Sequence, residues 1–330
     1  MSESAYFWFE VISMVVITGI LLADLLIVFK RPHIPSTKES SLWVAFYAGL
    51  AVIFGIIIAQ LFGAAKATEF FAGWLTEYSL SIDNLFVFVI IMTRFSVPKK
   101  YQQEVLMFGI ILSLVLRAIF IFLGVAILEN FKGVFYIFGA FLIYTAIHQL
   151  FRNREADEES ESKLTKFLSK RISYTETYDG MKFRTMIDGK KTFTPLLIVF
   201  ITIALTDVMF AFDSIPAIFG ITTDGFIVLT ANIFALMGLR QLYFLLGSLM
   251  EKLRFLEYGI SAILGFIGFK LVTHAMHINE LPFINGGKPI KWAPEISTTT
   301  SLIVIVSCLA ISAGASIIVA RREAAKSQTR

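Results

Sequence analysis

The chain has 330 residues, of which 56% are hydrophobic and 16% are charged, and its mean hydropathy is +0.74. This composition is typical of membrane proteins and excludes a soluble globular protein. The net charge of +4 does not indicate a nucleic-acid partner, because basic residues in a membrane protein mainly set its orientation. A single cysteine, Cys308, excludes an intrachain disulfide and a cysteine-based metal or redox site.

Apolar runs of about 20 residues predict an all-α polytopic membrane protein with about nine transmembrane helices. The expected spans are 7–29, 42–62, 69–93, 104–126, 131–150, 193–219, 226–249, 256–277 and 300–320. They divide the chain into an N-terminal membrane half (1–151), a charged cytoplasmic linker (152–192) and a C-terminal membrane half (193–330). The linker is a solvated tether or a regulatory segment, and 278–299 is a polar loop outside the membrane.

The loops that follow the odd-numbered spans hold most of the lysines and arginines, with the largest group between 152 and 192. The positive-inside rule therefore places the N-terminus outside and the C-terminus in the cytoplasm. The first apolar run follows no basic flank and is long enough to span, so we expect a helix there and not a cleaved signal peptide.

A polar pattern inside the third span recurs inside the sixth at an offset of 130 residues: a threonine and an acid, then, after five residues, an aspartate followed by an amide or a hydroxyl. The matched positions are Thr76, Glu77, Asp83 and Asn84 in the first copy and Thr206, Asp207, Asp213 and Ser214 in the second.

Two weaker matches extend the repeat. The fourth and seventh spans each contain one arginine, Arg117 and Arg240, and the spacing Gly139 to His148 in the fifth span equals that of Gly265 to His274 in the eighth. Each copy is then a three-helix unit. In the topology derived above, the third span crosses the membrane from outside to inside and the sixth from inside to outside, so the two units have opposite orientations. Inverted repeats with polar helices at their interface indicate a transporter.

Each acid at the bilayer centre costs about 2.5–3.5 kcal/mol, so something must neutralise the four acids. We expect two carboxylate pairs at two depths, Glu77 with Asp213 and Asp83 with Asp207, and a break in the sixth helix at Pro216 that frees carbonyl oxygens. These oxygens would suit Mn²⁺, Mg²⁺ or Ca²⁺ as the transported ion. The expected ligands are Glu77, Asp83, Asn84, Asp207, Asp213 and Ser214. Alternatively, the acids only pair with the two arginines and lock the helices together.

For several other polar residues the sequence allows two roles. Asp24 either joins the site or lies at the headgroups, and Asn232 either binds the ion or packs between helices. His274 and His277 either bind metal or cap a helix. Arg117 and Arg240 are expected to restrain the acids or to replace the charge of the ion.

Several long motifs resemble the TerC family of bacterial membrane proteins, which is named for tellurium resistance and includes Alx-type manganese exporters. They are Glu77-Tyr-Ser-Leu-Ser-Ile-Asp83-Asn84-Leu-Phe-Val-Phe, 94–103, 135–145, Thr206-Asp207-Val-Met-Phe-Ala-Phe-Asp213-Ser-Ile-Pro216-Ala-Ile, and 232–243. Family patterns have valine where Ile82 and Met209 stand, and both changes are conservative.

The resemblance implies a multi-pass protein of the bacterial plasma membrane that moves Mn²⁺ outward, for metal homeostasis or supply to exported proteins, through Glu77, Asp83, Asp207 and Asp213. The family is also similar to LysE-like exporters built from three-helix repeats. Tellurite is not taken as the substrate. The alternative is a membrane scaffold in a stress-response complex, which would dock exported metalloproteins or stress-response proteins through 152–192 and 278–299. Without a nucleophile–base set, phosphate loop or cofactor motif, we expect neither an enzyme nor a prosthetic group.

Overall fold

The protein is described by a computed structural model that covers residues 3–30, 35–151, 175, 177–187, 190–249 and 255–328. Its main elements are α1 (Glu3–Lys30), α2 (Thr37–Phe62), α3 (Ala64–Arg94), α4 (Lys99–Asn130), α5 (Val134–Leu150), β1 (Arg184–Ile187), β2 (Lys190–Phe193), α7 (Pro195–Phe219), α8 (Gly225–Leu236), α9 (Leu239–Leu249), α10 (Leu256–His277) and α11 (Thr298–Gln328). A short 3-10 turn, η2 (Asn285–Gly287), lies in the loop between α10 and α11.

The described residues contain eight helical segments that are long and apolar enough to cross a membrane, with α8 and α9 counted as one. The ninth expected span is the shorter apolar helix α5, of 17 residues. Large apolar side chains such as Val15, Phe122 and Ile311 are exposed on α1, α4 and α11. Because a continuous apolar exterior is stable only against lipid, the chain is an all-α integral membrane protein.

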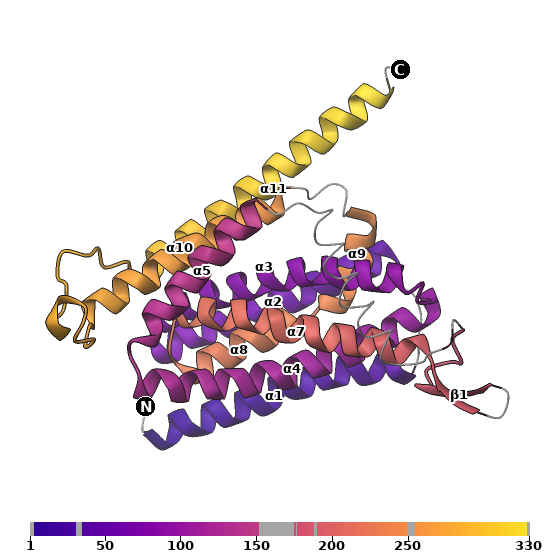
Figure 1. The fold of residues 1–330 in the computed structure, drawn as a ribbon, viewed down its shortest axis with the longest axis horizontal. Helices are drawn as coiled ribbons and strands as arrows, with labels where there is room; N and C mark the ends of the chain where they lie inside the picture. Colours follow the sequence, from indigo (N-terminus) through magenta and orange to yellow (C-terminus); the bar gives the residue numbers. More distant parts are fainter. Residues whose placement is uncertain are drawn as a thin grey trace.

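The spans form two groups (Figure 1). Helices α1–α4, α7 and α8 lie side by side, while α5, α10 and α11 cross them obliquely. Helices α3 and α8–α9 are the most buried spans, and α1 and α11 are the least buried. The centre of the bundle is therefore built from α3 and α8–α9, with α4 and α7 packed against them.

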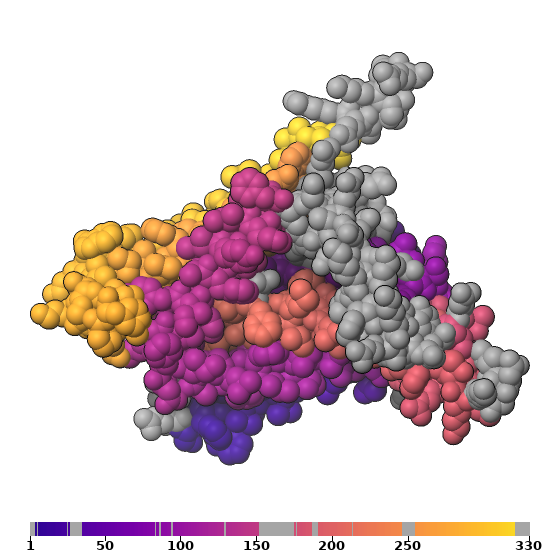
Figure 2. All heavy atoms as spheres, in the orientation of Figure 1, coloured from indigo at the N-terminus to yellow at the C-terminus, as the bar shows by residue number. Residues whose placement is uncertain are grey.

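The chain alternates between two ends of the bundle. The end at which α1 begins, here called the N-terminal end, also carries the turns after α2, α4 and α7 and the loop 278–297. The opposite end carries the turn after α3, the β1–β2 hairpin and the last turns of α11. In Figure 2 the loop 278–297 forms a lobe at one edge of the molecule and the hairpin lies at the other.

The expected break in the sixth span is wrong. Pro216 lies inside α7, which continues to Phe219. Proline has no backbone N–H, so the hydrogen bond to the carbonyl four residues earlier is lost. Pro216 lies only one turn from the end of α7, and the remaining hydrogen bonds of that turn keep the backbone helical. Beyond it the Gly220 amide donates to the Pro216 carbonyl at 3.0 Å.

The seventh span is the one that breaks. Helix α8 ends at Leu236 and α9 begins at Leu239, with Met237 extended and Gly238 at a φ of +81°. This φ lies in the left-handed region that glycine adopts at little cost. The carbonyls and amides at the interruption lie beside the most buried part of the bundle, as in transporters with discontinuous helices.

Helices α5 and α10 cross at two glycines. A Cβ atom added to Gly139 would lie 2.8 Å from the Gly268 carbonyl oxygen, and one added to Gly268 would lie 2.8 Å from the Gly139 carbonyl oxygen. The backbones of α5 and α10 therefore approach closely at Gly139 and Gly268. The match of Gly139 to Gly265, which concerns equivalent places in the sequence repeat, stays a prediction.

Most of the 152–192 linker, including the acidic run 155–161, lies outside the described residues. Its described part contains an antiparallel hairpin of β1 and β2, with Arg184 opposite Phe193. Ahead of the hairpin, the Tyr178 hydroxyl donates to the Phe95 carbonyl at 2.7 Å, which fixes this part of the linker against the turn after α3. This part of the linker is therefore folded, and the two expected roles of the linker, a solvated tether or a regulatory segment, stay predictions.

Candidate functional site

A group of buried polar residues lies at the centre of the bundle. Glu77 comes from α3, Arg117 from α4, Asp207 from α7 and Asn232 from α8. Each lies within a long apolar segment whose remaining residues pack or face lipid, so these side chains meet where the four helices converge.

Glu77 and Arg117 form a buried ion pair. The Arg117 NH1 group donates to Glu77 Oε2, and the two side chains are 2% and 1% exposed. Asn232 Nδ2 donates to the same carboxylate oxygen at 3.0 Å. Asn232 therefore contacts the Glu77 carboxylate, and both expected roles, ion binding and packing between helices, are consistent with this contact.

Arg117 also faces Asn84 and Asp207. With the Asn84 amide oriented so that both its groups are satisfied, its oxygen accepts from Arg117 NH2 at 3.3 Å and its nitrogen donates to the Leu80 carbonyl at 3.0 Å. Asp207 is held by a hydrogen bond from Ser113 and by its attraction to Arg117. One guanidinium thus balances the carboxylates of two helices that occupy equivalent places in the sequence repeat.

A small cavity of about 10 Å³ lies against these groups. Its polar lining is Ser81, Asn84, Ser113, Arg117 and Asp207, and Leu236 and Leu239 close it from both sides of the α8–α9 break. A cavity of this size is about that of a single water molecule. A species held there would touch protein oxygens directly.

Several buried oxygens of α3 and α7 have no hydrogen-bond partner among the described residues. Asp207 Oδ2 and the Ser81 hydroxyl line the cavity, whereas Glu77 Oε1 and the hydroxyls of Ser79 and Ser214 do not. A buried polar atom without a partner costs about 1–3 kcal/mol, so a cluster of them requires a ligand or water. Oxygens of this kind are the ligands of hard divalent cations.

The side chains of Asp83 and Asp213 lie outside the described residues, although their backbones belong to α3 and α7. The two expected carboxylate pairs, Glu77 with Asp213 and Asp83 with Asp207, therefore remain predictions. Among the described residues there is no group of three or more histidine, cysteine, aspartate or glutamate side chains placed to hold a metal. A site for a cation here would combine the described carboxylates with amide and hydroxyl oxygens.

Asp24 pairs with Arg240, and its two expected places, in the site or at the headgroups, stay predictions. Its side chain is 10% exposed and accepts from Arg240 NH2 at 3.0 Å and from Gln241 Nε2 at 3.4 Å. Since Arg240 follows the break at Gly238, this pair joins α1 to the start of α9. It is a second buried ion pair, separate from the Glu77–Arg117 pair.

The two histidines of α10 have packing roles. His274 meets the Phe135 ring edge-on at 5.1 Å, and a ring nitrogen of His277 is 2.8 Å from the Ala293 carbonyl oxygen. The second contact ties the end of α10 to the loop before α11, which is the capping alternative.

The model of the integral membrane protein TerC family matches residues 62–324, which include every residue of the central site. The chain belongs to the TerC family. A membrane protein of Mycobacterium tuberculosis is 41% identical over 334 residues, which cover 100% of this chain and 83% of the relative. The thylakoid membrane protein TERC of Arabidopsis thaliana is 46% identical over 236 residues, which cover 71% of this chain and 61% of that protein.

A third TerC relative, from Escherichia coli, carries the name "Putative membrane-bound redox modulator Alx". It is 39% identical over 274 residues, which cover 80% of this chain and 85% of the relative. No solved structure matches the chain.

Sequence reasoning missed three contributors to the polar core of this TerC protein. Ser113 binds Asp207, Gln241 binds Asp24, and Gly238 allows the helix break beside both. Of the three, only Gln241 has a usable signal in the sequence, because it follows Arg240 directly. A lone serine or glycine in an apolar helix is too common to be singled out from one sequence.

Proposed function

We propose that this TerC protein exports a divalent cation, with Mn²⁺ the best candidate, and that Glu77, Asp207 and Asn84 form part of its permeation site. The observation that carries the proposal is a water-sized cavity beside Arg117 that is lined by two buried oxygens without a hydrogen-bond partner, Asp207 Oδ2 and the Ser81 hydroxyl. Carboxylate, amide and hydroxyl oxygens together favour Mn²⁺, Mg²⁺ and Ca²⁺ over softer metals.

Arg117 provides the charge compensation that such a site needs in the absence of its ion. Two carboxylates in a low-dielectric interior repel each other unless a cation lies between them. The guanidinium supplies that cation when the site holds no metal, and an entering divalent ion takes over the role. The broken α8–α9 span supplies a place where the two halves can move against each other.

The loops predict the orientation on which the direction of export depends. The end of the bundle with the hairpin carries most of the basic residues and is assigned to the cytoplasm, and the N-terminal end is assigned to the outside. With this orientation, we propose that the protein lies in the plasma membrane of a bacterial cell and moves the cation toward its N-terminal end.

Manganese efflux from loaded cells tests the proposal. Cells expressing the wild type are expected to lose Mn²⁺ faster than cells without it, and the variants Glu77→Gln and Asp207→Asn are expected to abolish the difference at equal protein levels. Unchanged efflux in both variants would refute the assignment of the site.

A scaffold is the second candidate, and the exposed aromatic residues of the loop 278–297 favour it. Phe283 and Trp292 are 82% and 80% exposed at the N-terminal end. Aromatic residues in such positions are common in protein interfaces. A variant with Phe283→Ser and Trp292→Ser discriminates: a lost phenotype with normal Mn²⁺ efflux supports the scaffold, and an unchanged phenotype with normal efflux supports the carrier.

A further inference from the structure

Helix α9 lies between the central cavity and the end of the bundle that carries the β1–β2 hairpin, here called the hairpin end. Helix α8 starts at the N-terminal end and stops at Leu236, and α9 begins at Leu239 and lies nearer the hairpin (Figure 1). Both leucines line the cavity, and they are only 2% and 6% exposed. The break between α8 and α9 is therefore part of the cavity wall.

Apolar side chains close the cavity toward the hairpin end. Helix α3 runs toward that end, so Phe88 lies beyond the polar Asn84, and α4 runs away from it, so Ile110 lies before the polar Ser113. Phe88, Ile110 and Leu239 are all buried. An ion that enters from the hairpin end can reach the polar lining only when this apolar layer opens.

The start of α9 is the part of the apolar layer that adjoins a hinge. Met237 is extended and Gly238 has a φ of +81°, so the helix is interrupted there. Phe88 and Ile110 lie inside the continuous helices α3 and α4. The layer is therefore expected to open at α9, because a break in a helix absorbs a change of direction.

A buried carboxylate of α1 holds the start of α9 in place. Asp24 accepts hydrogen bonds from Arg240 NH2 at 3.0 Å and from Gln241 Nε2 at 3.4 Å, and both donors directly follow Leu239 in the chain. The Tyr47 hydroxyl of α2 interacts with the same carboxylate. These contacts fix the residues next to Leu239 against α1 and α2.

The contacts around Asp24 leave two buried polar atoms unsatisfied. Arg240 Nε and Gln241 Oε1 have no hydrogen-bond partner among the residues that the structure describes. A buried polar atom without a partner raises the free energy of the closed arrangement, and water can satisfy the atom once the arrangement opens. The free energy needed to separate α9 from Asp24 is lower as a result.

The place of Asp24 in the chain also indicates a role beyond packing. In the sequence repeat Arg240 matches Arg117, which pairs with Glu77 of the same three-helix unit. Arg240 pairs instead with α1, which belongs to neither unit and is one of the two least buried spans. A buried acid on such a span is costly, so a functional role is expected for it.

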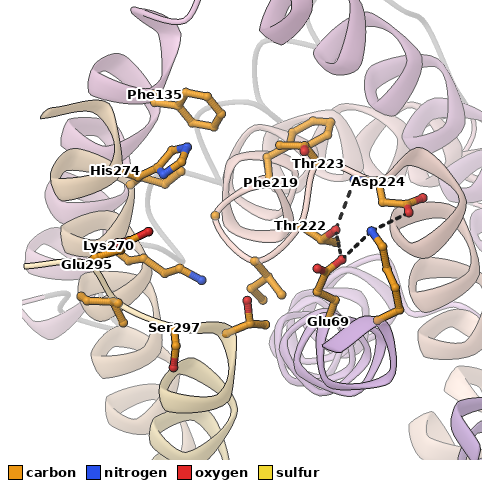
Figure 3. Close-up of a pocket in the computed structure, with 16 residues that line it drawn as sticks. Glu69, Phe135, Phe219, Thr222, Thr223, Asp224, Lys270, His274, Glu295 and Ser297 are labelled. Carbon is orange, nitrogen blue, oxygen red and sulfur yellow. Dashed lines mark hydrogen bonds and ion pairs between the residues drawn. The ribbon is translucent and has the colours of Figure 1, made fainter. Parts of the chain in front are cut away.

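The N-terminal end of the bundle is built differently. A pocket of about 770 Å³ opens there between the ends of α3, α7 and α8 on one side and α10 and α11 on the other (Figure 3). Thr223 in its lining is exposed. The central cavity thus has an open pocket toward the N-terminal end and the packed helix α9 toward the hairpin end.

We propose that α9 is the gate between the hairpin end and the central cavity, and that the Asp24–Arg240 pair is the latch that holds this gate closed. The inference rests on the proposed export function for the identity of the ion that passes. When the pair separates, α9 turns about Gly238 and Leu239 leaves the cavity wall. When the pair forms again, the ion can leave only toward the N-terminal end. Asp24 is thus a positioning residue that acts through α9.

Chemical labelling of a single cysteine in the cavity tests the latch. The full-length protein with Cys308→Ser and Ser81→Cys is treated with a membrane-impermeant methanethiosulfonate reagent in everted vesicles, which expose the hairpin end, and in right-side-out vesicles. Adding Asp24→Asn is expected to raise the labelling rate from the hairpin end by about tenfold, because a buried charge-assisted hydrogen bond no longer favours the closed gate. The labelling rate from the N-terminal end is expected to stay unchanged.

Two further variants separate a lost latch from a damaged fold. Asp24→Asn combined with Arg240→Gln leaves no unpaired buried charge, so it keeps the test available should the single variant not fold, and it is expected to show the same rise. Asp24→Glu keeps a carboxylate and is expected to be labelled as slowly as the parent protein.

Glu10→Gln is the matched control, because Glu10 lies on the same helix about 21 Å before Asp24. It is expected to leave the labelling rate unchanged. Thr223→Cys, used in place of Ser81→Cys, is expected to be labelled from the N-terminal end at one rate in every variant, which reports an intact fold. Equal labelling of the cavity cysteine in the Asp24→Asn and Glu10→Gln proteins, or a rise from both ends, would overturn the latch.

Mn²⁺ uptake by the wild type in the same everted vesicles separates this result from the export function. Uptake without a rise in labelling rejects the latch alone. A rise in labelling without uptake by the wild type rejects the export function and leaves a gated polar cavity.

Discussion

Arg117 is the residue on which the central site depends. It is almost fully buried and it contacts Glu77 from α3 while facing Asp207 from α7. The sequence predicted that the arginine would be buried and would either lock the acids or replace the ion. It could not predict which acid Arg117 contacts, because partner choice depends on how four helices pack.

Replacing Arg117 with methionine is expected to lower the free energy of unfolding by about 3–5 kcal/mol, because the buried Glu77 carboxylate would lose its counter-charge. Chemical unfolding in detergent measures the change. The double variant with Glu77→Gln and Arg117→Met is expected to recover most of this loss, since neither charge remains. If the single and double variants were equally unstable, the ion pair would not be the cause.

At the scale of elements, the bundle centre depends on the break between α8 and α9. Periodicity and apolar length predicted one continuous span, because Met237 and Gly238 fit an apolar helix. The positive φ of Gly238 and the approach of Tyr47 are tertiary features that no local pattern records. Conversely, the proline that the sequence marked as a break is accommodated in the last turn of α7.

Gly238→Ala is expected to destabilise the protein by about 1–2 kcal/mol, because alanine is strained at this φ and its Cβ would approach the Tyr47 ring to 3.2 Å. Thermal unfolding in detergent is the measurement. Gly314→Ala in α11 is the matched control, since a Cβ there meets nothing within 4 Å. Equal melting temperatures for the two variants would show that the break does not require glycine.

The crossing of α5 and α10 gives a second prediction at this scale. Gly268→Ala is expected to cost about 1–3 kcal/mol, because the new methyl group would lie 2.8 Å from the Gly139 carbonyl oxygen. Gly265→Ala, one turn earlier, places its Cβ an ordinary 3.5 Å from Ala146 and is expected to be tolerated. Unfolding measurements that ranked the two variants in the opposite order would contradict the assigned crossing.

At the scale of the whole molecule, composition and hydropathy predicted the fold class and nearly every span. They succeeded because a bilayer imposes a minimum apolar length on each crossing. They missed the hairpin Arg184–Phe193 because its strands are short and rich in charge, so no span-length pattern marks them. Of the site, the sequence singled out Glu77, Asp207 and Asn232, while the way in which they share Arg117 followed only from the packed bundle.

The orientation is a property of the whole chain and is testable with a membrane-impermeant maleimide on intact cells. In a Cys308→Ser background, Phe283→Cys is expected to be labelled from outside, and Met186→Cys only after the membrane is permeabilised. Both positions are more than half exposed in the structure, so access to them depends on the side of the membrane. The reverse labelling pattern would invert the topology.

Mn²⁺ uptake by everted membrane vesicles tests the central claim most directly. Vesicles with the wild type are expected to accumulate Mn²⁺, in preference to Zn²⁺, and vesicles with Asp207→Asn are expected to match empty vesicles. Asp179→Asn, a change of the same kind beside the hairpin, is expected to transport normally. Wild-type transport in the Asp207→Asn vesicles would contradict the account.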